Sequence, residues 1–513
     1  MEQNKRDVPS SFTGEIKRSV PTIIAYKAAA VWKLILREYV FNYYFLHMTY
    51  TLIVIFIASG ILCGIQKDIR YIDSLFTCTS AITTTGLIVL DTSLLPKTAQ
   101  VLIFFLILLG NGILLSLVPL VKRILFSYLP KLATSNKNDN EKIYAKLQIR
   151  ACIIIIVVVL VYWVCCVLIG ISIFLTLGLD PEYNYVIHDK FINLNNGWFS
   201  TFNTISVISN AGFSLMPDSS VSLAKLFVPI ATSLWLIASG VCFYPIFLRI
   251  IFCCLKFFFP NDKAINLIYK FPRLVYTHLF LNSDTIKLLI VLLILNTFQF
   301  SLALGLDWDD PILEGLSSWE KVYNEAMQSF STKHAGINSL NIAAASIAVI
   351  VLYIGCMYLS AYPVTISVRG TKIEDPTSSS HYVRDMFFND LLIVFIGVLI
   401  ICIIENENLK DFPDDYTALK IVFEVVSAYG TVGLSLGYGS EYTSFSYAFH
   451  TGSKVIIIII MVLGKHRPLP NSDDPALTGR VSLEDFEKQW QELFANTNKK
   501  EEEDTKELTK IEN

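Results

Sequence analysis

Charged side chains are scarce in this chain, and their scarcity excludes an ordinary soluble domain. Asp, Glu, Lys and Arg make up 17% of the 513 residues and hydrophobic residues 53%, whereas soluble domains carry about 25% charged residues. A membrane-spanning helix needs roughly 20 apolar residues in succession. Five uncharged runs reach about that length: Tyr39–Gln66, Thr98–Val121, Ala151–Leu179, Leu226–Leu248 and Leu288–Leu306. The composition therefore predicts an all-α integral membrane protein.

Motifs of enzymes and metal sites are missing as well. The ten cysteines lie mainly in apolar runs and form no CxxC pair, which favours buried thiols over a disulfide framework or a metal site. No Gly-Lys-Ser/Thr motif for phosphate is present, which argues against a pump driven by nucleotide hydrolysis. A multispan enzyme would need clustered His, Asp or Glu side chains near a membrane face. Five histidines are instead scattered, with no pair at metal-ligand spacing: His188, His278, His334, His381 and His450. We therefore expect no enzyme activity, no cofactor and no nucleic-acid partner, and a multispan membrane enzyme is a distant alternative.

A short segment that contains a glycine occurs four times along the chain. Three copies place a serine six residues before the glycine, and all four place an apolar residue after it. The copies are Ser80–Leu87, Ser206–Phe213, Phe330–Ile337 and Phe423–Ser435. Each follows an apolar stretch too short to cross a bilayer and precedes a longer one. A single glycine of this kind would most simply let two helices pack closely, but four copies in the same setting favour four walls around one hole.

Glycine after a half-length helix suits a pathway for cations. Outside helices, backbone polar groups at membrane depth are tolerated only where they line a water-filled path or are buried in protein. Glycine permits positive φ angles, the helix directs its partly negative C-terminal end toward the ion, and a ring of carbonyls replaces the hydration shell of an alkali cation. We predict a selectivity filter that holds potassium or sodium through backbone carbonyls. Its predicted residues are Thr84, Thr85, Gly86, Asn210, Ala211, Gly212, His334, Ala335, Gly336, Thr431, Val432 and Gly433.

The four copies divide the chain into repeats of a helix, a re-entrant half-helix, a filter and a second helix, with eight spans and four re-entrant segments. The filter glycines are 126, 124 and 97 residues apart, which is typical of parallel repeats about an axis along the membrane normal. We predict pore units at 39–125, 149–252, 285–368 and 385–464 around a single central pore, joined by cytoplasmic loops at 126–148, 253–284 and 369–384. A cytoplasmic N-terminus at 1–38 and a cytoplasmic tail at 465–513 flank them. The second helices are expected at Ala99–Leu120, Leu223–Leu248, Asn341–Val364 and Tyr442–Gly464.

Loop charges predict the orientation. The stretch 122–150 holds seven Lys or Arg residues and two acids, whereas the loops that begin at Asp307 and at Glu405 are acidic. The positive-inside rule places the basic loops and both termini in the cytoplasm, so that every filter enters from outside a multi-pass plasma membrane protein. The acidic outer loops would either raise the local cation concentration or be ordinary solvated surface, and the sequence leaves both open.

In its filters and its last helix the chain resembles the Trk/Ktr/HKT superfamily of potassium and sodium transporters, in particular the eukaryotic HKT and fungal Trk branches. The resemblance covers residues 39–470. The most specific matches are the fourth filter, Ser427–Ser435, and the run Gly464–Pro470, and further matches are Arg70–Asp73, Lys333–Gly336 and Ser453-Lys454. The second filter, by contrast, is not a close copy of either branch.

The resemblance implies four helix–pore–helix units around one pore, usually in a homodimer with one pore per subunit in a lipid bilayer. In plant members, serine at the first filter position accompanies sodium selectivity and glycine accompanies potassium permeation. Because Gly86 occupies that position, the resemblance implies potassium transport into the cell, with or without sodium. The alternative is a sodium-selective uniporter or a sodium–potassium symporter of the same fold.

Lys454 is the only charged residue in the expected last helix. An intramembrane lysine is costly and by default marks a functional site. On a descending helix it would lie roughly 10–15 Å or more below the filter, where the resembling family carries a cation that acts as a barrier or gate. The alternative is that Lys454 snorkels to the cytoplasmic interface, although about 15 Å of helix separates it from Lys465.

Lys333 is a second cation close to a filter, three residues before Gly336. It would repel cations if it faced the pore axis. We therefore expect it behind the filter, paired with an acid such as Glu325 or Glu424.

Overall fold

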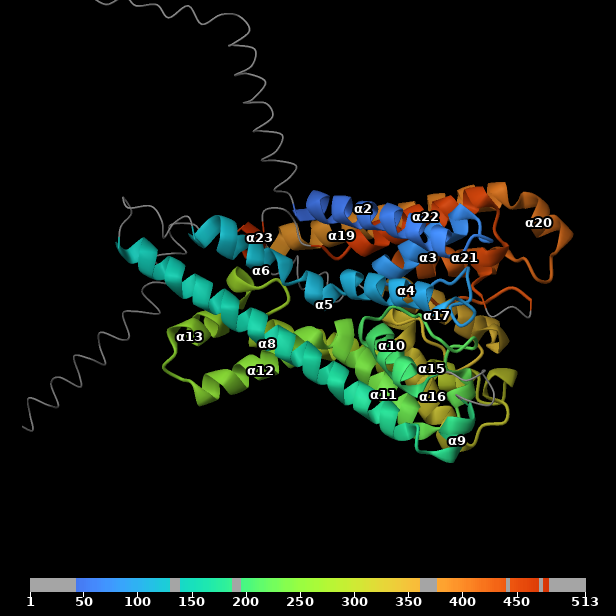
Figure 1. Cartoon of the computed structure of the whole chain (residues 1–513), viewed down its shortest axis with the longest axis horizontal. Helices are drawn as coiled ribbons and strands as arrows, with labels where there is room; N and C mark the ends of the chain where they lie inside the picture. Colours follow the sequence, from blue (N-terminus) through green and yellow to red (C-terminus); the bar gives the residue numbers. More distant parts are fainter. Residues whose placement is uncertain are drawn as a thin grey trace, which may run out of the picture.

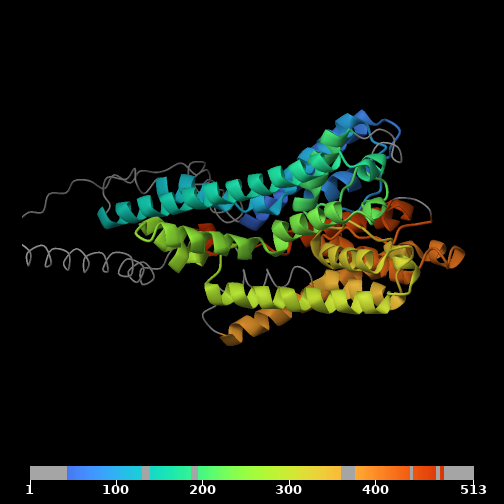
Figure 2. The same cartoon turned by 90° about the horizontal axis from the view of Figure 1, so that it is seen from below.

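The computed structural model describes residues 43–129, 139–186, 195–359, 376–439, 443–469 and 474–478, and these ranges contain helices and loops but no strand. The predicted N-terminus at 1–38 and the tail beyond residue 478 lie outside the described residues. Most long helices run along the long axis of the molecule (Figure 1 and Figure 2). The all-α class predicted from the composition is confirmed for the described ranges.

A long helix begins each of the four predicted units. These helices are α2 (Tyr43–Ile65), α8 (Asp139–Leu177), α15 (Asn282–Leu306) and α19 (Pro376–Ile404). Three of them, α2, α8 from Lys142 onward and α15, are long and apolar enough to cross a membrane. Their exposed surfaces are hydrophobic, with Ile57 of α2 and Ile294 of α15 60% and 62% exposed. Such helices have no polar face to turn to water and are suited to lipid.

The second helices are broken or short, and the two expected at Ala99–Leu120 and Leu223–Leu248 are each divided by a sharp bend. In the first unit α4 (Lys97–Gly110) gives way to α5 (Gly112–Leu115) and α6 (Val118–Arg123), with a bend of 45°. The Asn111 side chain accepts hydrogen bonds from the N–H groups of Ile113 and Leu114, which starts a new helix at the bend.

In the second unit α11 (Phe227–Ile237) passes through the π-helix η5 (Ala238–Cys242) to α12 (Tyr244–Phe258), and the axis turns by 76°. Pro245, which lacks an N–H, stands in the first turn of α12. With each bent pair counted as one span, up to five helices in the described ranges could cross a membrane. The second helices of the other units, α17 (Ile347–Leu359) and α22 (Thr451–His466), are shorter.

Four short helices occupy the places of the predicted half-helices. They are α3 (Tyr71–Thr83), α10 (Asn196–Ile208), α16 (Ser318–His334) and α21 (Ala418–Gly430). Local caps fix where three of them start. Asn195 and Thr417 accept hydrogen bonds from the first turns of α10 and α21, and Ser317 forms a capping box at the start of α16. All four lie in the half of the molecule that ends at α20 (Asn406–Asp411) (Figure 1).

Contacts between these helices close into a ring. Each second helix packs against the short helix of the next unit, α4 on α10, α11 on α16 and α17 on α21. The last one, α22, packs on α3 from the start of the chain as well as on α21. The two ends of the described chain therefore meet, and this closure positions the site.

Candidate functional site

The glycines predicted to form a filter lie next to one another in a closed ring. A methyl group added to Gly86 would lie 2.7 Å from the carbonyl oxygen of Ala211, and one added to Gly212 would lie 3.0 Å from that of Ala335. Added methyl groups on Gly336 and Gly433 would come closer still, to the carbonyl oxygens of Val432 and Thr85 respectively. Each glycine thus faces the residue that precedes the next glycine, and no side chain fits between them.

The backbone around the ring needs glycine for a second reason. Gly86, Gly212, Gly336 and Gly433 have φ angles of +92°, +72°, +61° and +89°, values that residues with a Cβ atom rarely adopt. Two residues earlier, Thr84, Asn210 and Thr431 are left-handed as well, with φ near +50°, and there the short helices end. The third copy differs, because α16 continues through His334 and Ala335 has a φ of −101°.

The serine that precedes each glycine ties the loop back to its short helix. Ser80 and Ser427 accept hydrogen bonds from the N–H groups of Gly86 and Gly433, at 3.0 and 3.1 Å. Ser206 donates to the carbonyl of Phe213 at 2.6 Å. In the third copy Ser331 accepts from the N–H of Ile337 and donates to its carbonyl. The third copy thus uses the same device displaced by one residue.

Three glycines of the second helices also support the ring, and the sequence analysis missed them. A Cβ atom on Gly110, Gly240 or Gly464 would collide with the carbonyl oxygen of Ile82, Ile208 or Tyr429 respectively. Each of these carbonyls belongs to the residue four positions before a filter glycine. Each of them is a small residue in an apolar run, and such residues let membrane helices approach closely. This pattern could have identified them from the sequence.

The ring separates two cavities. The outer cavity, of about 530 Å³, is lined by all four filter glycines, and Asp218 is the one charged residue among its described lining. The inner cavity, of about 150 Å³, is lined by Thr84, Asn210 and Thr431 and by residues from the opposite ends of the second helices. The predicted filter residues are therefore brought together, with Thr85, Ala211, Ala335 and Val432 fully buried between the cavities. The side chain of His334 lies outside the described residues.

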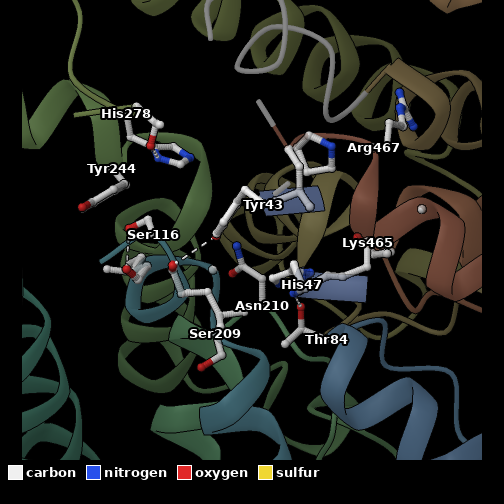
Figure 3. A pocket seen from close by; sticks show the side chains of 18 of the residues that line it. Tyr43, His47, Thr84, Ser116, Ser209, Asn210, Tyr244, His278, Lys465 and Arg467 are labelled. Carbon is white, nitrogen blue, oxygen red and sulfur yellow. Dashed lines mark hydrogen bonds between the residues drawn. The ribbon is translucent and has the colours of Figure 1, made fainter. Parts of the chain in front are cut away.

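A cation does lie below the ring, but it is Lys465. Its ammonium donates hydrogen bonds of 2.8 Å to the Thr84 hydroxyl and to the carbonyl of Gly110, and its side chain lines the inner cavity (Figure 3). The nearby Arg467 is paired with Asp390 at 3.0 Å. Among the described lining of the inner cavity there is no acidic residue.

The predicted position of Lys454 is wrong. The helix α22 starts at Thr451, nine residues later than expected, so Lys454 lies in its first turn, at the other end of the helix from Lys465. Its ammonium is fully buried and pairs with Asp73 of α3 at 2.7 Å. It therefore lines neither cavity and joins the last helix to the first short helix.

Lys333 lies behind the filter, as expected, but its predicted acidic partners are wrong. Its ammonium donates to the side-chain oxygens of Asn296 and Gln299, at 2.9 Å each. Glu325 instead accepts a hydrogen bond from the Tyr353 hydroxyl. Glu424 accepts from Ser435 and Ser446 and braces the loop that follows the fourth filter.

The first acids of the two acidic loops act as structural caps. Buried Asp307 accepts hydrogen bonds from the N–H and hydroxyl groups of Ser346. Burial raises the pKa of Asp307, and these hydrogen bonds offset only part of the rise. Buried Glu405 accepts from the backbone and the ring of His450. Neither lines the outer cavity, where Asp218 supplies the negative charge.

Apolar helices around a ring of glycine backbone are the architecture of membrane proteins that pass cations. The chain belongs to the TrkH family of cation transport proteins, whose model matches residues 22–382 and 375–477. This membership confirms the resemblance to the Trk/Ktr/HKT superfamily, which is a family of transport proteins and not of enzymes, as expected.

Individual proteins similar to this chain are named as potassium transport proteins. Potassium transport protein 1 of Schizosaccharomyces pombe is 34% identical over 304 residues, which cover 56% of this chain and 36% of that protein. A putative potassium transport protein of Dictyostelium discoideum is 32% identical over 286 residues, 55% of this chain and 42% of that protein. The chain thus spans less than half the length of these curated relatives. The crystal structure of the potassium transporter TrkH from Vibrio parahaemolyticus has the same fold, with a TM-score of 0.54 and 14% identity over 84% of this chain and 83% of that chain.

Proposed function

We propose that this protein conducts potassium, with or without sodium, into the cell through a selectivity filter of four glycine segments. The observation that carries the proposal is the closed glycine ring with a cavity on either side. Both relatives from Schizosaccharomyces pombe and Dictyostelium discoideum are named as potassium transport proteins, which supports potassium as the cargo.

The ring offers the groups that an alkali cation needs. The carbonyls of Thr85, Ala211, Ala335 and Val432 each face the glycine of the preceding copy around the ring, so four oxygens surround one axis and can replace water around a dehydrated ion. The C-terminal ends of the four short helices point at the same place and add partial negative charge. An ion would pass from the outer cavity, past these carbonyls, to the inner cavity.

Lys465 is the proposed barrier in this path, in place of Lys454. Its ammonium donates a hydrogen bond to the hydroxyl of Thr84, on the inner side of the filter. Any cation that enters the inner cavity must therefore pass close to it. A fixed positive charge there would slow conduction without a role in choosing between potassium and sodium.

The remaining features of the predicted architecture belong to the same proposal. Eight spans would be α2, α4 to α6, α8, α11 to α12, α15, α17, α19 and α22, grouped in the four predicted pore units. The basic helix α13 (Lys263–Lys270) lies at the end of the molecule opposite α20 (Figure 1). By the positive-inside rule this end would face the cytoplasm, and both termini would lie on the same side. We propose a homodimer in the plasma membrane with one pore in each subunit.

The test is two-electrode recording with potassium and sodium exchanged in the bath, on the wild type and on Gly86→Ser. We expect the reversal potential of the wild type to follow potassium, and the variant to lose preference for potassium over sodium because its side chain crowds the ring. Gly60→Ser is the matched control, since Gly60 of α2 has no atom within 4 Å of an added methyl group. A wild-type reversal potential that follows sodium alone would indicate the sodium-selective alternative, and one that ignores both ions would refute conduction.

A further inference from the structure

The last described segment of the chain, residues 474–478, is bound to the inner end of the protein. Its helix α23 (Pro475–Thr478) contacts α6 and α14 (Pro272–Val275), at the end of the molecule opposite α20 (Figure 1). The residue before it, Asp474, pairs with Arg273 of α14 at 2.7 Å. The side chains of this pair are only 3% and 14% exposed, which makes it far less accessible than a surface ion pair.

A second arginine holds the same segment by its backbone. Arg123, at the end of α6, is 1% exposed and donates to the carbonyls of Val275 and Ala476, at 2.7 and 3.2 Å, as well as to the Tyr128 hydroxyl. The guanidinium thereby joins α6, α14 and residues 474–478 at one point. Asp474 also caps its own helix, because it accepts from the N–H of Ala476.

The segment places an apolar side chain at the inner cavity. Leu477 is 5% exposed and lines that cavity together with Pro119 of α6 and with Thr277 and His278, which follow α14. The opposite end of the cavity is the filter, through Thr84. Residues 474–477 therefore lie at the cytoplasmic end of the proposed conduction path (Figure 3 shows His278, Lys465 and Thr84 in the wall of the cavity).

We propose that residues 474–477 form a cytoplasmic lid on the inner cavity, held closed by the Asp474–Arg273 pair and by Arg123. The lid joins α6, which is the part of the first unit beyond the bend at Asn111, to α14, which belongs to the connection between the second and third units. Release of the segment removes Leu477 from the cavity wall and leaves α6 and α14 joined only by their direct contacts, such as the hydrogen bond from Arg123 to the Val275 carbonyl, which opens the cavity to the cytoplasm. As a regulator of transport the lid rests on the proposed function, but its effect on access to the cavity does not.

Access to the cavity is measured with a reporter cysteine. Leu115, which lines the inner cavity, is replaced by cysteine in the full-length chain. Inside-out membrane vesicles are treated with a charged methanethiosulfonate reagent, and mass spectrometry follows the rate at which residue 115 is modified. The chain without the reporter cysteine gives the background. We expect Asp474→Asn and Arg273→Gln to speed modification by about tenfold, which corresponds to 1.4 kcal/mol of lost docking energy. The exchange Asp474→Arg with Arg273→Asp should restore much of the slow rate.

Asp284→Asn is the matched control, because it breaks an ion pair on the surface. The partner of Asp284 is Lys287, whose side chain is 75% exposed. We expect no change in the modification rate. If Asp474→Asn yields no folded protein, the lid is tested with Leu477→Ser instead. This variant leaves the ion pair in place and removes only the apolar side chain from the cavity wall. An unchanged modification rate in the folded variants overturns the lid.

Current recording separates this proposal from the proposed function. With a lid on a conducting path, Asp474→Asn raises the potassium current and leaves the preference for potassium over sodium unchanged. Faster modification in a protein that passes neither ion would refute conduction and leave the lid. Normal conduction with an unchanged modification rate would refute the lid alone.

Discussion

Replacement of Lys465 by glutamine tests whether a fixed charge controls conduction below the filter. The ammonium is 2.8 Å from the Thr84 hydroxyl and from the Gly110 carbonyl, and glutamine can keep a hydrogen bond there without the charge. At an effective dielectric of about 20, a cation about 6 Å from the ammonium is repelled by roughly 3 kcal/mol. Water and nearby carbonyls would reduce this energy, but about 1.4 kcal/mol still changes a rate tenfold.

We therefore expect Lys465→Gln to raise the inward potassium current per folded protein by at least about tenfold, or to change its voltage dependence. The preference for potassium over sodium should stay nearly unchanged, because the ring of carbonyls is untouched. Lys465→Arg is the control that retains the charge, and it should resemble the wild type. The assay is current recording normalised to surface protein. Unaltered conductance and rectification in a well-expressed Lys465→Gln variant would refute the barrier while leaving the filter in place.

Three further predictions follow from the contacts of the ring. Lys454→Gln should lower the free energy of unfolding by about 1.5–3 kcal/mol without raising conductance, because Asp73 loses its buried partner and keeps only the exposed Arg70 at 2.9 Å; detergent melting curves measure this, and a well-folded variant with a larger current would return Lys454 to the pore. In a dimer with Gly433→Asp in one subunit, about half of the current should remain if each subunit holds a whole pore, and complete silencing would show a shared pore. Gly464→Ala should destabilise the protein by about 1–3 kcal/mol, since its Cβ would meet the Tyr429 carbonyl; a melting temperature equal to the wild type would show that α22 can shift away.

The sequence alone was sufficient for the class of protein, the four short helices and the four glycine segments that form the ring. Hydropathy and helix length are local properties, and the membrane imposes them on each segment separately. The serine-to-glycine spacing was readable for the same reason, because Ser80 and Ser427 bond to residues six positions along their own loops. The displaced third copy also agrees with its sequence, where Ser331 stands one residue later relative to its glycine.

The order of contacts around the ring depends on tertiary structure. Nothing local to Gly433 shows that its neighbour is Thr85, because the two meet only after α22 has packed on α3. The bends at Asn111 and near Pro245 were likewise hidden, because a broken apolar run and a straight one have nearly the same hydropathy.

The identity of the lysine that lies below the glycine ring is the clearest case. Its depth depends on where α22 begins, and contacts distant in the sequence decide that start. Ser444 pairs with the backbone of Ile88 beyond the first filter, through its own N–H and its hydroxyl, and Glu405 accepts from the N–H of His450. These bonds hold the chain on the outer side up to residue 450, so that Lys454 meets Asp73 and Lys465 arrives below the ring. Composition and spacing could place a lysine in this helix, but only the packing of the first and last units against each other determined which lysine lines the inner cavity.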